Sequence, residues 1–67
     1  MKYSLDQRLY NMNITKKDLQ KECVKRGRNI SYSSVCKVIN EPEEVLYSTE
    51  KKVIETVEEL ELERGIA

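Results

Sequence analysis

The segment SYSSVCKVIN, residues 31–40, places hydroxyl, thiol, ammonium and amide groups around a short apolar pattern. Val35, Val38 and Ile39 are spaced as the buried stripe of a helix. The residues left on the outward side are Tyr32, Ser33, Cys36 and Lys37, with Ser34 at the flank. Such side chains donate and accept hydrogen bonds but include no nucleophile paired with a base. The chemistry that this pattern predicts is recognition of a polar surface.

The rest of the composition disfavours catalysis and metal binding. The chain has no histidine, and its two cysteines, Cys23 and Cys36, stand outside any CxxC spacing, so we expect no metal site. Without a glycine-rich phosphate loop, and with 67 residues in which to build a pocket, we expect no enzyme, no cofactor and no small-molecule ligand. We expect reduced thiols that pack as small apolar groups, in a cytoplasmic protein with no membrane partner.

Charge is divided unevenly along the chain, although the net charge is zero. Residues 1–40 hold nine lysines and arginines against three acidic residues, and residues 41–67 hold three basic residues against nine glutamates. This asymmetry indicates a basic surface followed by an acidic segment. Lysines at 16, 17, 21 and 25 either form a solvated helix face or contact a polyanion.

The side chains of residues 31–40 need a helical framework to position them. One Pro and two Gly leave few turn signals, which favours a few long helices over many short strands. We predict an all-α, compact bundle of four helices, or five, in a single domain spanning residues 1–67. In residues 3–12, Ser4 is the expected N-cap, and Leu5, Leu9 and Met12 form a stripe that ends at Asn11–Asn13.

Three further helices follow from caps and periodicity. Thr15 with Asp18 resembles a capping box, Leu19 and Cys23 share a face, and Gly27 stops that helix. Ser31 caps the next helix, where Ile30 can pack onto Val35. The last helix spans about 48–64 and carries its apolar stripe at Val53, Val57 and Leu60. Residues 41–47 are a predicted loop, with either Val45 or Leu46 returning to the core.

Three segments resemble the lambda-repressor-like helix-turn-helix superfamily, and most closely the DNA-binding headpiece of lactose-repressor-type regulators. They are TKKDL (15–19), ISYSSVCKVIN (30–40) and TEKKVIETVEEL (49–60). The resemblance covers roughly residues 13–62, and the first helix is similar to that of phage repressors. The chain departs from the pattern between Leu19 and Ile30, where it is about one helical turn longer. Cys23 is the best counterpart of the family's small residue at the helix crossing.

The resemblance implies a helix-turn-helix over about 15–40 that binds double-stranded DNA, with residues 31–40 in the major groove. Base-contacting positions fall on Tyr32, Ser33 and Lys37. Phosphate-contacting positions fall on Thr15, Ser31, Ser34 and Asn40, and we expect Lys16, Lys17 and Arg28 to contact phosphates as well. A small sequence-specific transcriptional regulator is implied, such as a repressor or control protein of a phage or mobile element.

The acidic segment 41–67 cannot lie along DNA, because its carboxylates would be repelled by phosphates. We expect it to serve a homodimer or a larger protein partner, since one small module offers few base contacts. Ile54, Leu62 and Ile66 form the predicted dimer seam. The alternative hypothesis is a protein-interaction module, which would use the same fold to bind another regulator or a polymerase subunit through the acidic helix.

Overall fold

The computed structural model describes residues 5–65, and Ser4 and Ile66 lie outside them. The described chain contains four α-helices and one turn of 3₁₀ helix: α1 (Leu5–Asn11), α2 (Lys16–Lys25), α3 (Tyr32–Asn40), η1 (Pro42–Glu44) and α4 (Tyr47–Glu63). No strand occurs between residues 5 and 65. The all-α prediction is therefore confirmed, and η1 is the one element found within the predicted loop.

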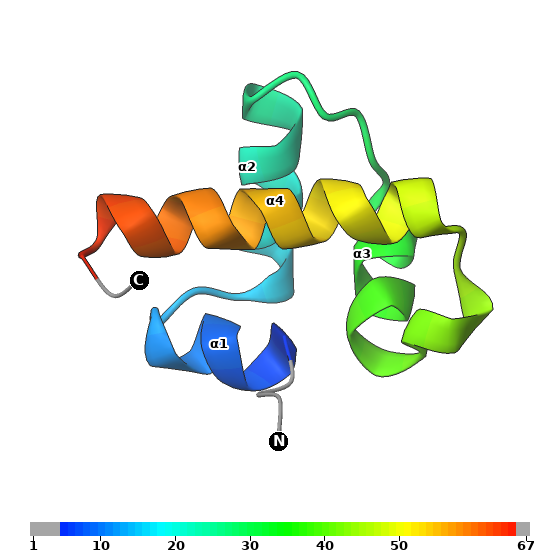
Figure 1. Ribbon diagram of the computed structural model, residues 1–67, viewed down its shortest axis with the longest axis horizontal. Helices are drawn as coiled ribbons and strands as arrows, with labels where there is room; N and C mark the ends of the chain where they lie inside the picture. The colour runs from blue at the N-terminus through cyan, green and yellow to red at the C-terminus, as the bar shows by residue number, and fades with distance from the viewer. Residues whose placement is uncertain (1–4, 66–67) are drawn as a thin grey trace.

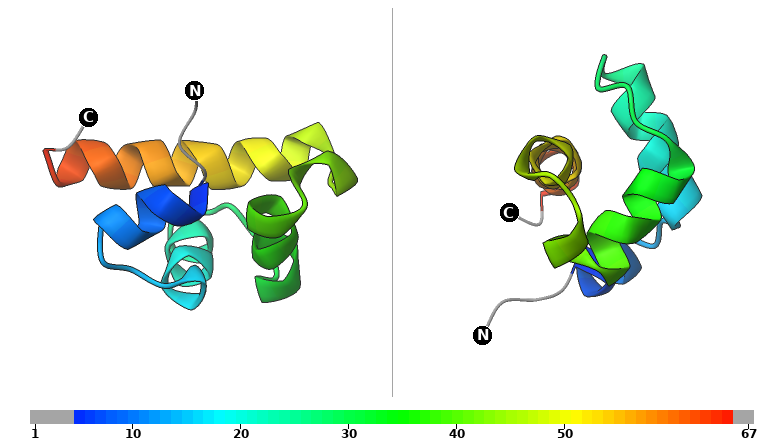
Figure 2. Two further views of the ribbon diagram at one scale, coloured as in Figure 1. Left: turned by 90° about the horizontal axis from the view of Figure 1, so that it is seen from below. Right: turned by 90° about the vertical axis from the view of Figure 1, so that its right-hand side faces the viewer.

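The helices form two layers, with α4 alone in one of them (Figure 1). Viewed from below, α4 runs along one side while α1, α2 and α3 lie together beneath it (Figure 2). α4 makes its closest approaches to α2, α3 and α1. One face of α2 and α3 is therefore covered by α4, and the opposite face is left to solvent.

The ends of α1 and α2 are closed by the same backbone motif. Asn13 and Gly27 adopt the left-handed conformation, with φ of 60° and 83°. After α1, Ile14 N–H donates to the carbonyl of Leu9 at 3.1 Å, and after α2, Arg28 N–H donates to that of Cys23 at 2.8 Å. These are Schellman-type closures, which satisfy carbonyls that the helix leaves without partners. The predicted stops at Asn11–Asn13 and Gly27 are confirmed.

The helix starts also follow the sequence. Thr15 Oγ1 accepts from Asp18 N–H at 3.1 Å, while the Asp18 carboxylate accepts from Thr15 N–H at 3.0 Å. This completes the predicted capping box of α2. The hydrogen bond from the Thr15 backbone N–H, with a smaller contribution from the Thr15 side chain, holds the pKa of the Asp18 carboxyl below its usual value. Ser31 Oγ accepts from Ser34 N–H at 3.3 Å and so caps α3 as expected.

The core is built from the predicted stripes of all four helices. Its buried residues are Leu9, Met12, Leu19, Cys23, Ile30, Val35, Val38, Val53, Val57 and Leu60. Leu5, Ile14, Ile39 and Val45 pack around them and are partly exposed. Val45, rather than Leu46, is thus the loop residue that returns to the core, and Leu46 is 75% exposed. No helix of the described chain is long and apolar enough to cross a membrane.

Candidate nucleic-acid interface

The outward face of α3 is polar and carries no carboxylate. Tyr32, Ser33, Lys37 and Asn40 are exposed on it, and Cys36 is half-buried. Val35 and Val38 point the other way and fix the helix to the core. A hydrogen bond to Cys36 is the main reason that the pKa of the Tyr32 hydroxyl is raised above its ordinary value. The three predicted base-contacting residues therefore lie on one accessible surface.

The N-terminal end of α3 gathers three serine hydroxyls. Ser31 Oγ donates to Ser34 Oγ at 3.0 Å and lies 3.3 Å from Ser33 Oγ. The same oxygen caps the helix, so one hydroxyl organises the whole first turn. Free N–H groups at a helix start and hydroxyls beside them are suited to an anionic oxygen. The capping hydrogen bond is by itself a sufficient reason for a serine at position 31.

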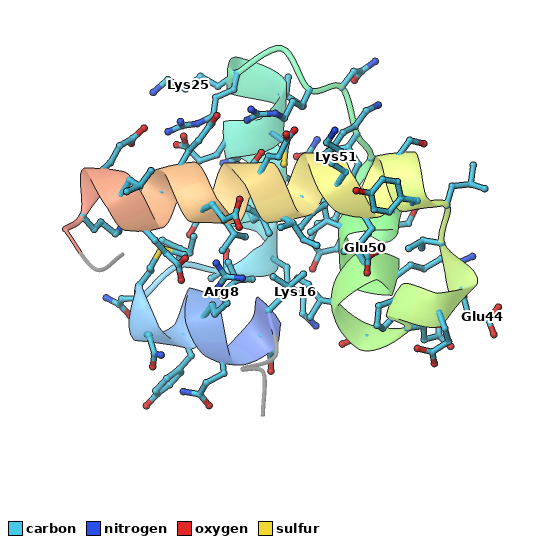
Figure 3. The ribbon with its side chains drawn as sticks, viewed as in Figure 1. Arg8, Lys16, Lys25, Glu44, Glu50 and Lys51 are labelled. Carbon is cyan, nitrogen blue, oxygen red and sulfur yellow. The ribbon has the colours of Figure 1, made fainter. Side chains whose placement is uncertain are left out.

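The start of α2 lies against the end of α3. Lys16 Nζ donates to Asn40 Oδ1 at 3.5 Å, and Figure 3 shows Lys16 between α1 and α3. This contact places Lys16 next to Asn40, and Thr15 and Lys17 are the neighbours of Lys16 in the chain. The polar groups thus form two clusters at opposite ends of α3, with Lys37 on the helix between them. Nine helical residues span about 13 Å at 1.5 Å each.

The segment between α2 and α3 is longer than a tight turn. Residues 26–31 connect the helices, and Gln20 Nε2 donates to the Ile30 carbonyl at 3.0 Å across them. Ile30 itself is buried, which anchors the segment to the core just before the Ser31 cap. These two contacts fix the approach of α3 to α2 in the extended region that the sequence predicted.

Arg28 is directed toward α4 rather than toward the outward face of α3. Its guanidinium donates to both carboxylate oxygens of Glu59, at 2.8 and 2.7 Å, and lies 3.9 Å from Glu55. Arg26 pairs with Glu22, with Glu59 and with Glu63. Hydrogen bonds from Arg28 and then Arg26 lower the pKa of Glu59 to about 2. The structure therefore separates Arg28 from the other residues predicted to contact phosphates.

Thr56 lies at the centre of this network and is fully buried. Its hydroxyl accepts from Cys23 Sγ at 3.4 Å and from Arg28 Nη1 at 3.2 Å, and it donates to the Lys52 carbonyl at 2.9 Å. Burial raises the pKa of the Cys23 thiol, as expected for an inert packing residue. Cys23, the candidate for the α2–α3 crossing, thus also joins α2 to α4.

Sequence reasoning did not identify this polar network. The sequence does contain a pattern that could have indicated the network: glutamates repeat at 55, 59 and 63, which places three carboxylates along one flank of the last helix. The adjacent Thr56 also falls within the apolar stripe formed by Val53 and Val57. A carboxylate row beside a buried hydroxyl indicates a basic partner from another element.

The arginines and the lysines of the basic segment have different environments. Arg8, Arg26 and Arg28 all form ion pairs with glutamates of α4. The lysines of α2 and α3 form no ion pair with any residue between 5 and 65; they are Lys16, Lys17, Lys21, Lys25 and Lys37. The positive charge that remains accessible on these two helices is therefore carried by lysines.

The predicted dimer seam is divided by the fold. Ile54 is half-buried and lies in a groove that also contains Leu5 of α1, whereas Leu62 is 67% exposed. Ile66 lies outside the described residues. The two described residues therefore face different surroundings.

No protein-family model matches the chain, and no curated protein and no solved structure is significantly similar to it. A functional conclusion therefore rests on the residues and contacts described above.

Proposed function

We propose that this chain is a sequence-specific DNA-binding protein of the helix-turn-helix type, in which α3 enters the major groove. The observation that carries the proposal is the carboxylate-free outward face of α3, with serine hydroxyls at one end and the Lys16–Asn40 pair at the other, which are groups suited to phosphates. The roughly 13 Å length of α3 is comparable to the width of the major groove, about 12 Å. The two end clusters can therefore contact phosphates on opposite sides of the groove while Tyr32, Ser33 and Lys37 meet base edges.

The position of the acidic helix supports the same orientation. α4 packs on the face of α2 and α3 opposite to solvent, so its carboxylates stand away from a duplex bound at α3. Arg28 belongs to that α4 network and is left out of the proposed contact set. The phosphate contacts proposed are Thr15, Lys16, Lys17, Ser31, Ser34 and Asn40. The function that follows is transcriptional control, with two copies on two half-sites supplying the affinity that one module lacks.

The test is an amide-shift NMR titration of the full chain with a random-sequence duplex at low salt. We expect shifts at residues 15–17 and 31–40 that disappear as salt is raised. Lys37→Ala should weaken binding about tenfold, and Lys51→Ala, which removes the same charge from exposed α4, should leave it unchanged. Shifts confined to α4, or no shifts at all, would contradict the proposal and favour the protein-interaction module.

A further inference from the structure

A groove lies on the side of the molecule formed by α1, η1 and α4, away from the outward face of α3. It has a volume of about 450 Å³, and its apolar surface comes from Leu5, Val38, Pro42 and Ile54. Val38 is buried beneath it, whereas Pro42 is exposed. The groove thus connects directly to the core and is open to solvent, as a docking site for an apolar side chain requires.

The rim of the groove carries unbalanced negative charge. Its lining includes Glu50 and Glu58, which form no ion pair with any residue in the described range. The one cation of the lining, Arg8, donates to both oxygens of Glu61, with a distance of 2.9 Å from Nε, and the charge of Glu58 also helps to raise the pKa of Arg8. One cation therefore stands against three carboxylates, those of Glu50, Glu58 and Glu61. In Figure 3, Arg8 projects from α1 toward α4, and Glu50 projects from α4 toward α3 and η1.

The two rim carboxylates are placed regularly along α4. Glu50, Ile54 and Glu58 follow one another at intervals of four residues, so they lie on one flank of the helix. The carboxylate positions are separated by about 12 Å along the axis, at 1.5 Å per residue, and Ile54 lies midway between them. A carboxylate, an apolar side chain and a second carboxylate therefore form one linear recognition pattern.

We propose that this groove binds a partner protein through an amphipathic helix with basic residues four positions before and after a buried leucine-like side chain. Such a helix presents cation, apolar group and cation at the spacing of Glu50, Ile54 and Glu58, and charge complementarity selects it over an acidic or neutral segment. DNA is disfavoured as an occupant, because its phosphates would meet both carboxylates. The inference does not depend on DNA binding at α3.

The experiment uses the full chain and a capped alanine-based peptide with the pattern Lys-x₃-Leu-x₃-Lys. We expect amide and methyl shifts at Leu5, Val38 and Ile54, and no response to a peptide in which both lysines are glutamine. Glu50→Gln with Glu58→Gln should weaken binding about tenfold. Glu55→Gln is the matched control, because it removes a carboxylate from the opposite flank of α4, and it should change the dissociation constant less than twofold.

Two results would overturn the proposal. One is equal affinity of the doubly substituted chain and of the parent chain for the lysine peptide. The other concerns the chain's own N-terminal residues, which include Lys2 and lead directly to Leu5. Nuclear Overhauser contacts between Lys2 or Tyr3 and the Ile54 methyls in the free chain would assign the groove to that segment instead.

Discussion

Thr56 joins three parts of the molecule through a single hydroxyl. It accepts from Cys23 of α2 and from Arg28 of the α2–α3 segment, and it belongs to α4. Its side chain is fully buried, so solvent cannot replace either hydrogen bond. The orientation of the segment that leads to α3 thus depends on one polar group in the core.

Replacing Thr56 by valine keeps the shape of the side chain and removes its hydroxyl. We expect Thr56→Val to lower the free energy of unfolding by about 1–2 kcal/mol, because two donors lose their acceptor. Thr49→Val is the control: this half-buried threonine of α4 makes no side-chain hydrogen bond within residues 5–65, and the change should stay within about 0.5 kcal/mol. Urea unfolding followed by circular dichroism measures both. Equal effects would remove the role assigned to the hydroxyl.

Gly27 closes α2 in a left-handed backbone conformation. Its φ of 83° is strained for any residue with a Cβ, although no atom lies within 4 Å of the place a Cβ would take. Gly27→Ala should therefore cost about 1–2 kcal/mol through backbone conformation alone. Gly65→Ala, at a φ of 72° just beyond α4, should cost less because the last turn can fray. A smaller loss at Gly27 than at Gly65 in urea unfolding would contradict this account.

Contacts between residues close in the chain could be predicted from the sequence, whereas contacts between distant residues could not. The caps at Thr15 and Ser31 depend on contacts within three residues, and the sequence predicts both correctly. Arg28 differs, because its ion-pair partner Glu59 is 31 residues away in the chain. That pairing depends on how α4 crosses α2, which local patterns do not determine. A basic residue beside a recognition motif is therefore a candidate for a phosphate contact only where the fold places no carboxylate next to it.

At the scale of elements, α4 is held by ion pairs on both of its flanks. Arg8 of α1 binds Glu61 on one side, and Arg26 and Arg28 bind glutamates on the other. Its buried stripe of Val53, Val57 and Leu60 lies between them. The periodicity of that stripe predicts the helix and its inward face, whereas the groove beside Ile54 requires the positions of α1 and η1. Local sequence patterns therefore predict that the helix exists, but they do not predict the groove.

The ion pairs of α4 predict how stability depends on pH. The folded pKa of Glu59 is about 2, below its ordinary value of 4.5, so its contribution is complete above about pH 5 and is lost as pH falls toward 2. The pKa values of Glu61 and Glu63 are lowered as well, by Arg8 and Arg26 respectively, which adds to the loss in the same direction. We expect the melting temperature to fall between pH 5 and pH 2.

Glu59→Gln separates this effect from general acid unfolding. The variant should melt below the parent chain at pH 7, and the difference should shrink toward pH 2, where Glu59 of the parent becomes protonated. Glu58→Gln removes an exposed carboxylate of the same helix and should show little change at either pH. A Glu59→Gln difference that persists undiminished at pH 2 would show that the carboxylate charge is not responsible.

At the scale of the whole molecule, zero net charge conceals a separation into two layers. α4 supplies half of the acidic side chains of the chain, and it forms ion pairs with the arginines that face it. The lysines of α2 and α3 form no such ion pair within residues 5–65, although Lys21 and Lys25 line a pocket together with Leu60 and Glu63 of α4. The sequence indicates this polarity through its uneven charge, but not that the arginines would pair with glutamates of α4 while the lysines would not. Under the proposed function, lysines alone supply the salt-dependent part of DNA binding.

The salt dependence of DNA binding tests quantitatively whether lysines, and not arginines, contact the phosphates. The two lysines proposed to contact phosphates, Lys16 and Lys17, give an expected slope of log K against log salt concentration of about −1.8, at 0.9 per phosphate. If Arg26 and Arg28 left α4 to bind phosphates as well, the slope would approach about −3.6. Fluorescence anisotropy of a labelled duplex at several salt concentrations distinguishes these values.

Single substitutions show which residues contribute to the slope of log K against log salt concentration. Lys17→Ala should make the slope less negative by about 0.9, because one phosphate contact is lost. Arg28→Gln, which removes the positive charge, should leave the slope unchanged, since Arg28 is bound to Glu59 of α4 rather than to DNA. Lys51→Ala, on the exposed side of α4, is the control for a general loss of positive charge. A slope that responds to Arg28 but not to Lys17 would place the DNA at the α4 network and reverse the proposed orientation.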